Sequence, residues 1–323
     1  MGRTAYLRRI LAAYLLPGPS QLTFWHETPA VNPEARPGEL GPYWQSFAEK
    51  ADYPGPFDPE GIPLLDYRGR LGLQYNPIAV AQYGLGNWNL WKRNGDPERR
   101  RKFLLAADWL AARLEPNPAG LKVWNHRFDW EYRDPLRAPW YSGLAQGQGI
   151  SALVRAHQET GKTSYLEAAR EAFRPLLRKT SEGGVLHLDD TGRPWIEEYL
   201  VSPPTHILNG FIWALWGVYD YHLATREPEA RDLFDRCLDT LRSNLSRYDA
   251  GYWSLYEQSG TRLPMLASPF YHRLHIVQLR ILHALTGDPI FKDFADRWEG
   301  YSRRRLNRLK ALFLKSLFKL CYY

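Results

Sequence analysis

The chain has 323 residues, of which 44% are hydrophobic and 24% charged, and its formal net charge is +7. That length can bury a substantial core, and the composition is typical of a globular protein and not of a disordered one. From Arg303 onward the chain holds seven basic residues and no acidic one, so this tail carries the whole charge excess. The body is formally neutral, which argues against a basic surface built for nucleic acid.

The cysteines and the hydropathy pattern exclude further classes. Cys237 and Cys321 are far apart in the sequence, so neither a disulfide framework nor a zinc site is expected. No run of about 18 apolar residues exists, and no membrane-spanning helix is therefore expected. The N-terminal apolar run stops at Pro17 without a small-residue cleavage site, which favours a short helix or an arm over a signal peptide. No cofactor is expected.

Residues 17–74 are rich in proline, which excludes regular helix over most of this span. We expect residues 1–74 to form an N-terminal arm and a wrapping segment or small β region, with short extended pieces near 22–25 and 63–66.

Helical patterns begin after Tyr75, and breaks at Gly95, Gly161, Arg226 and Gly287 recur at intervals of about 60–66 residues. Each repeat pairs an apolar helix with an amphipathic one. This predicts a mainly α fold, an α/α barrel or toroid of about four helical hairpins over residues 75–301, with a linear solenoid as the alternative. The expected helices are 77–88, 98–114, 143–160, 164–178, 207–224, 228–245, 272–285 and 290–301.

The links that precede the inner helices would meet at one end of such a barrel. They contain ionisable and aromatic residues, among them Glu198 and Tyr199 just ahead of Pro203 and Pro204. A β-hairpin expected at 248–256 would cover the same mouth. A loop with an acid and a phenol is by itself more often a solvated loop, but this convergence favours a site there.

Five segments carry a family resemblance: YNPIAVAQYGLG (75–86), YSGLAQGQGISALVRAHQETG (141–161), EEYLVSPPTHILNGFIWALWGVYD (197–220), YDAGYWSLY (248–256) and YHRLHIVQL (271–279). They resemble the catalytic C-terminal domain of D-glucuronyl C5-epimerases, isomerases that convert glucuronic to iduronic acid within heparan-type polysaccharides. The resemblance covers about residues 61–301. It implies an α/α barrel and a uronic-acid polysaccharide as the substrate.

The resemblance also implies the catalytic residues Tyr199, Tyr256, Tyr271 and Glu198. Inverting C5 requires a base and an acid on opposite faces of the sugar, and donors or cations beside the uronate carboxylate. We assign Tyr199 and Tyr271 as the opposed proton-transfer pair. Glu198 is the alternative base, and Tyr256 is an orienting acid or proton relay.

The sequence departs from the family pattern at two places. Leu200 stands where the family has a proline, and Ser259 stands where it has an arginine. Arg262 or Arg273 could supply the missing positive charge, which leaves the identity of the group that binds the carboxylate open.

Other polar residues of the expected inner helices and their links are candidates for substrate binding. The histidines could bind substrate or satisfy the core, and they lack the third partner that a metal site needs. The amides could either connect the helices or bind sugar hydroxyls. The candidates are Tyr75, Gln82, Tyr83, Gln146, Asn209, His272 and His275.

The tail, residues 302–323, is predicted to be a basic amphipathic helix. At helical spacing one face holds Arg304, Arg308, Lys315 and Lys319, and the opposite face holds Leu306, Leu309, Phe313, Leu317 and Leu320. This pattern favours an anionic membrane surface as a partner, with docking of the apolar stripe on the barrel or binding of acidic polymer as alternatives. We expect a cytoplasmic protein that is peripheral to the membrane, or a Golgi-lumen one if the source is eukaryotic. A homodimer remains open.

Two other functions are compatible with the sequence. A uronate polysaccharide lyase or another toroid enzyme would share the fold. A hydrolase would need two opposed carboxylates, whereas Glu197 and Glu198 are sequence neighbours. A non-catalytic, membrane-associated glycan-binding protein would bind uronate polymer without exchanging the C5 hydrogen.

Overall fold

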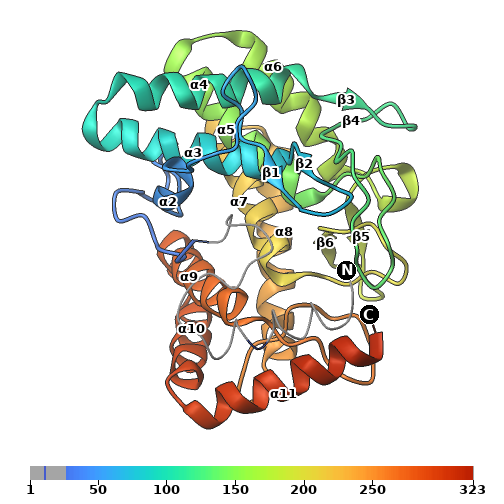
Figure 1. The fold of residues 1–323 in the computed structure, drawn as a ribbon. Coiled ribbons are helices and arrows are strands. Elements are labelled where there is room, and N and C mark those ends of the chain that lie inside the picture. Colours follow the sequence, from blue (N-terminus) through green and yellow to red (C-terminus); the bar gives the residue numbers. More distant parts are fainter. Residues whose placement is uncertain (1–10, 12–26, 323) are drawn as a thin grey trace.

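The computed structural model describes Leu11 and residues 27–322, which form a mainly helical molecule (Figure 1). The expected N-terminal arm and the extended piece near 22–25 lie outside the described residues. In the described part, the long helices are α3 (Pro77–Asn94), α4 (Pro97–Ala112), α5 (Gly143–Thr160), α6 (Thr163–Phe173), α7 (Leu208–Thr225), α8 (Pro228–Asn244), α9 (Pro269–Thr286), α10 (Pro289–Ser302) and α11 (Arg305–Tyr322).

These bounds agree with the predicted helices, although some helices begin or end at other residues than predicted. Asp96 and Asp288 each accept a hydrogen bond from the second residue beyond them and are followed by proline, so α4 and α10 begin there. Gly161 ends α5 with a φ of 71°, a conformation that suits glycine. The predicted helix 164–178 is shorter, because Pro175 cannot donate to the helix, and a 3₁₀ turn (Arg174–Leu177) follows α6.

The remaining elements are short. Three antiparallel pairs of strands are described: β1 (Leu65–Asp66) with β2 (Leu73–Gln74), β3 (Glu115–Pro116) with β4 (Lys122–Val123), and β5 (Leu186–Leu188) with β6 (Pro194–Ile196). The hairpin expected at 248–256 is present as a bridge between Asp249 and Ser254. Two further 3₁₀ turns (Thr180–Glu182, Leu245–Tyr248) and α2 (Ala48–Ala51) complete the described elements.

Four hairpins arise from the long helices of the described region: α3/α4, α5/α6, α7/α8 and α9/α10 (Figure 1). Their first helices pack against one another in chain order, most extensively α5 against α7. Gly147 and Gly217 make this approach so close that a Cβ on either would collide with the backbone of the other helix. Because α7 is buried on nearly every side and α8 on one face only, the predicted inner and outer layers are confirmed.

The proline-rich lead packs against the inner helices. Tyr43 stacks on Phe47, and its backbone N–H donates to Asn89 of α3. Trp44 donates its indole N–H to Asp220 of α7 at 3.1 Å. This segment therefore wraps the body and fills space that the helices alone would leave.

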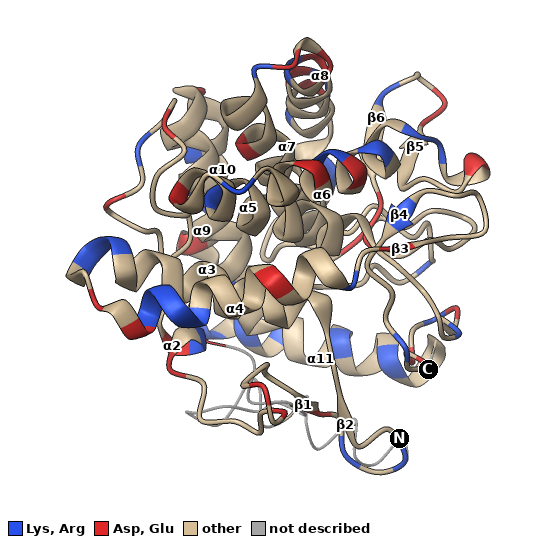
Figure 2. Cartoon of the chain, turned by 90° about the horizontal axis from the view of Figure 1, so that it is seen from above, with Lys and Arg blue, Asp and Glu red and all other residues tan. Residues whose placement is uncertain are grey.

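Helix α11 follows α10 and carries Lys and Arg along its length (Figure 2). Its buried residues are Ala311, Lys315 and Phe318, which lie on one side of the helix. Lys315 lies on the predicted basic side of the helix, but this side is partly buried there, because Ala311, Lys315 and Phe318 seat the helix on the body. No helix in the described part of the chain is both long and apolar enough to cross a bilayer.

Candidate active site

Phenol rings gather where the links before α7 and α9 meet the 252–267 segment. Tyr199 packs edge-on to Tyr132 with 4.7 Å between ring centroids, and Tyr256 packs edge-on to Tyr271 at 4.8 Å. The first three are almost fully buried, whereas Tyr271 is partly exposed. Phe318 of α11 belongs to the same cluster and is fully buried. The structure thus brings the three predicted catalytic tyrosines together.

Glu198 lies beside these rings and is 5% exposed. Its carboxyl is hydrogen-bonded to Tyr199, and Asn209 donates its side-chain N–H to Oε2 at 3.5 Å. Gly210 leaves the space that the carboxyl occupies, since a Cβ there would overlap Oε2. Burial raises the pKa of Glu198 to about 8, and the nearby Glu257 and Glu197 add to this increase. At neutral pH the group is therefore mostly a neutral acid.

We expect Glu198→Gln to change how stability depends on pH. The native protein keeps the Glu198 proton up to about pH 8, while the unfolded chain releases it near the ordinary pKa of 4.5. Stability from this group is therefore fully present below pH 4.5 and is lost as pH rises towards 8. The amide does not titrate and avoids this loss, so the variant should gain stability relative to the parent between pH 5 and pH 8.5. The gain is at most about 1.4 kcal/mol for each pH unit crossed in that interval.

Urea unfolding at pH 5 and at pH 8.5 measures this difference. The exposed Glu167→Gln is the matched control and should alter both values equally. An advantage of Glu198→Gln that is the same at both pH values would contradict the prediction.

Glu257 is a second buried carboxyl in the cluster and was not identified from the sequence. It is 2% exposed, and Tyr132 donates its hydroxyl hydrogen to Oε2. Burial raises the pKa of Glu257, whereas Tyr132, Ser259, Lys315 and Arg133 lower it. Its Oε1 has no hydrogen-bond partner among the described residues, and neither do Asn209 Oδ1 and Thr205 Oγ1 in the same region. Such unpaired buried oxygens are suited to receive hydroxyl groups of a ligand or water.

Two cations adjoin this carboxyl. Lys315 of α11 is 7% exposed, donates to the carbonyl of Leu266 at 2.6 Å and lies over the Tyr256 ring at 5.7 Å. Burial lowers its pKa to about 8. Arg133, from the loop before α5, donates Nη1 to the carbonyl of Ser259 at 3.4 Å. Ser259, which stands where the family has an arginine, is therefore in contact with an arginine from elsewhere in the chain.

Other predicted binding residues lie in different surroundings. Tyr75 donates its hydroxyl to Asp58 at 2.6 Å, and Tyr83 packs in the core against Phe57. Gln82 donates to Gln148 at 2.9 Å and accepts from Lys50. Gln146 joins α5 to the carbonyl of Ala172 at 2.9 Å and to the backbone of Lys122 and Trp124. In this structure the two amides connect the helices.

His272 and His275 converge on Ser254, whose Oγ lies 2.8 and 3.0 Å from their Nδ1 atoms. His272 donates Nε2–H to the carbonyl of Trp298 at 3.0 Å and stacks on Trp253. Burial lowers the pKa of His272 to about 4 and that of His275 well below its usual value, so both rings are neutral. They join α9, α10 and the hairpin. No cluster of three metal-ligating side chains occurs in the described ranges.

Arg262 and Arg273, the predicted cations, are both exposed. Glu197 is buried as well, and its carboxyl group pairs with His206 at 2.5 Å. The site residues that the sequence did not reveal are Glu257, Tyr132, Arg133 and the inward-facing Lys315. Only Glu257 had a local signal, because it directly follows the catalytic candidate Tyr256.

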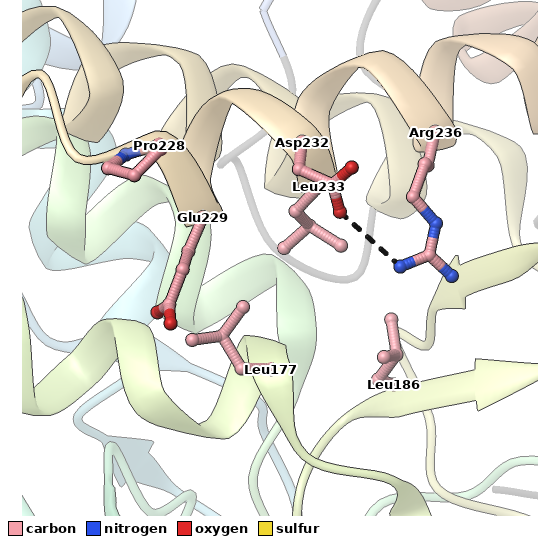
Figure 3. Close-up of a pocket in the computed structure, with 7 residues that line it drawn as sticks. All are labelled: Leu177, Leu186, Pro228, Glu229, Asp232, Leu233 and Arg236. Atoms are coloured by element: carbon pink, nitrogen blue, oxygen red, sulfur yellow. Dashed lines mark hydrogen bonds and ion pairs between the residues drawn. The ribbon is translucent and has the colours of Figure 1, made fainter.

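A cavity of about 380 Å³ lies elsewhere, between α8 and the 177–186 region (Figure 3). Three leucines and a proline line one part of it, and its ion pair joins Asp232 to Arg236 within α8. It holds no nucleophile or general acid apart from the outer-helix carboxylates, so the phenol–carboxyl cluster is the better candidate site.

Helical hairpins in two layers define an α/α-toroid fold, and the buried cluster of phenols and carboxyls is its candidate site. An unsaturated glucuronyl hydrolase specific for heparin has the same fold: it superposes on 98% of this chain and 95% of its own with a TM-score of 0.50 and 12% identity. At that identity the match establishes the fold and not the reaction.

Residues 120–300 match the family described as the D-glucuronyl C5-epimerase C-terminus, and the chain belongs to this family. The D-glucuronyl C5-epimerase of Caenorhabditis elegans is 32% identical over 215 residues, which are 62% of this chain and 35% of that protein. The unsaturated chondroitin disaccharide hydrolase of Streptococcus pneumoniae is 25% identical over 199 residues, 59% of this chain and 46% of that protein. The chain thus spans about a third of the nematode relative and less than half of the streptococcal one.

Proposed function

We propose that the protein is an epimerase that inverts C5 of glucuronic acid residues within a polysaccharide, giving iduronic acid. The observation that carries this proposal is the convergence of Tyr199, Tyr256 and Tyr271 with Glu198 in one largely buried cluster. Family membership supports it, and the name of the nematode relative suggests the substrate class.

The reaction needs proton transfer on both faces of the sugar ring. Tyr199 and Tyr271 lie in two different ring pairs of the cluster, which suits groups that act on opposite faces. Burial and the neighbouring acid Glu198 raise the pKa of Tyr256 well above its ordinary value. Tyr256 therefore stays protonated and serves as a hydrogen-bond donor or proton relay and not as the base.

The polymer can contact the cluster at its partly exposed edge. Its partly exposed members are Trp130, Trp140, Val201, Leu263, Tyr271 and Tyr322. Aromatic faces at such an edge suit sugar rings, which stack their C–H faces on them. We infer that the chain of sugars lies over this edge and presents one uronate to the buried groups.

Incubation of glucuronate polymers, heparosan first, in deuterated water tests the proposal by NMR. An epimerase exchanges the C5 hydrogen and gives iduronate signals without cleaving the polymer. A lyase would instead give the ultraviolet absorbance of an unsaturated product, and a glycan-binding protein would exchange nothing. Either of these results would overturn the proposal.

A second candidate reaction is hydrolysis of a uronide. Two buried carboxyls, Glu198 and Glu257, interact within the cluster, which provides the pair that Glu197 and Glu198 could not. The streptococcal relative is named as a hydrolase of unsaturated chondroitin disaccharides. Loss of absorbance from unsaturated uronic disaccharides, with new reducing ends, would support hydrolysis over epimerisation.

We also propose that the outer face of α11 rests on an anionic membrane surface. Leu306, Leu309, Phe313 and Leu320 are 80%, 51%, 67% and 47% exposed. At about 100° per residue they form a stripe opposite the buried Ala311, Lys315 and Phe318. The stripe is therefore not what seats the helix on the body. Exposed Arg305 and Lys310 flank it, a charge pattern that complements acidic headgroups.

We expect Leu309→Ser/Phe313→Ser to weaken binding to vesicles of phosphatidylcholine with phosphatidylserine by at least about tenfold, because two large apolar groups no longer insert. Flotation of the full chain measures it. Leu73→Ser, at a leucine that is also 51% exposed but lies far from α11, should leave binding unchanged. Equal flotation of all three proteins would contradict the proposal. Vesicle binding that does not change with phosphatidylserine content or with salt concentration would contradict it as well.

A further inference from the structure

Removal of the C5 proton places negative charge on the adjacent uronate carboxylate, and a cation beside that carboxylate stabilises it. A carboxylate that enters this buried cluster also needs a positive charge beside it, because burial disfavours the charged form. Ser259 stands where the family resemblance expects an arginine. If the proposed function holds, another group of the chain must supply the charge of this arginine.

Arg133 brings a guanidinium to the position of the missing side chain. Its side chain is 14% exposed, and Nη1 reaches the carbonyl of Ser259 at 3.4 Å. Asp134 occupies the other edge of the guanidinium, accepting from Nε at 3.0 Å and from Nη2 at 2.8 Å. The hydrogen bond from Nη1 to Ser259 is long and weak. Nη1 is thus the part of the guanidinium best able to donate to a bound carboxylate.

The neighbouring residue fixes where this guanidinium points. Tyr132 is buried among the catalytic tyrosines and donates to Glu257. The loop therefore enters the cluster at Tyr132, and Arg133 follows directly beside the 256–259 segment. Both Arg133 and Lys315 are close enough to lower the pKa of Glu257, so two cations face one short stretch of chain.

We propose that Arg133 takes the place of the arginine missing at residue 259 and binds the carboxylate of the bound uronate, with Lys315 of α11 as a second positive charge beside it. This assignment rests on the proposed function. Arginine suits the role because its planar fork matches a carboxylate. Lys315 lies outside residues 120–300, so this part of the site comes from a helix beyond the region that matches the family.

Binding measurements separate this inference from the reaction itself. Calorimetry compares a glucuronate-containing heparosan oligosaccharide with the same oligosaccharide whose carboxyls are reduced to alcohols. The unaltered protein should prefer the charged ligand, and Arg133→Gln should reduce that preference by at least about tenfold, the value of a hydrogen bond to a charged group. Lys315→Met, which keeps most of the length of the side chain and removes its charge, should reduce it to a smaller extent, and Lys315→Arg should restore it.

A swap provides the sharpest control. Arg133→Gln/Ser259→Arg returns the arginine to the family position and should regain the preference for the charged ligand. Arg137→Gln removes an arginine of the same loop that is 78% exposed and paired with Asp129, and should have no effect. Equal binding of both ligands by the unaltered protein, or an unchanged preference in Arg133→Gln, would overturn the inference. The preference for the charged ligand, and not the loss of C5 exchange in Arg133→Gln, decides the inference about Arg133. Absence of C5 exchange by the unaltered protein would refute only the proposed function.

Discussion

Replacing Tyr199 or Tyr271 with phenylalanine should slow conversion of glucuronate to iduronate by at least about a hundredfold, the usual contribution of a positioned acid or base. Each substitution removes one hydroxyl and keeps the ring, so the packing of Tyr199 on Tyr132 and Trp140 is retained. The stability of the variants should therefore change little, and lost activity would report the proton transfer itself.

The two variants should also fail in different ways. If the tyrosines act on opposite faces, each variant keeps the group that removes the proton from one epimer. One variant should then still exchange the C5 hydrogen of glucuronate polymer in deuterated water, and the other that of iduronate polymer, although neither interconverts them. Tyr165→Phe is the control, because that hydroxyl bonds to Asp108 on the outer helices. Near-normal epimerisation by both variants would rule out this assignment of roles.

The helical repeat was predictable because its signals are local. Asp96 and Asp288 each precede a proline, and these caps fix where an outer helix begins whatever packs on it. The apolar first helices and amphipathic second helices then required two layers. The length of α6 was misjudged although Pro175 is visible in the sequence, because Arg174 keeps a helical conformation and a 3₁₀ turn follows α6 directly.

The candidate site was only partly predictable, since Lys315 and Phe318 of α11 help to form it. The segment after Tyr256 is polar and resembles a solvated loop, and Glu257 becomes buried because distant residues, among them Phe318, close the cluster. In the sequence, the exposed stripe of α11 gives a stronger hydrophobic pattern than the short inner face of Ala311, Lys315 and Phe318. Which face packs is decided by the shape of the body, and sequence periodicity does not contain that information.

Removing the carboxylate of Asp220 should destabilise the protein by about 3–5 kcal/mol, because it leaves a buried guanidinium without its counter-ion. Asp220 and Arg155 are both fully buried, and Arg155 Nη1 lies 2.6 Å from the carboxylate. Arg155 also donates to the carbonyls of Gly41 at 2.9 Å and Ser151 at 3.0 Å. The pair joins α5 to α7 and attaches the proline-rich lead through Gly41 and Trp44.

Urea unfolding of Asp220→Ala measures the loss, and Asp235→Ala is the control. Asp235 pairs with Arg231 at 2.7 Å within α8, but both side chains are about half exposed, so its loss should cost no more than about 0.5 kcal/mol. Replacing both partners, as in Arg155→Met/Asp220→Leu, should recover most of the stability, because no unpaired charge remains buried. If the double variant is as unstable as Asp220→Ala, the lost stability comes from the hydrogen bonds to the lead and not from an unpaired charge.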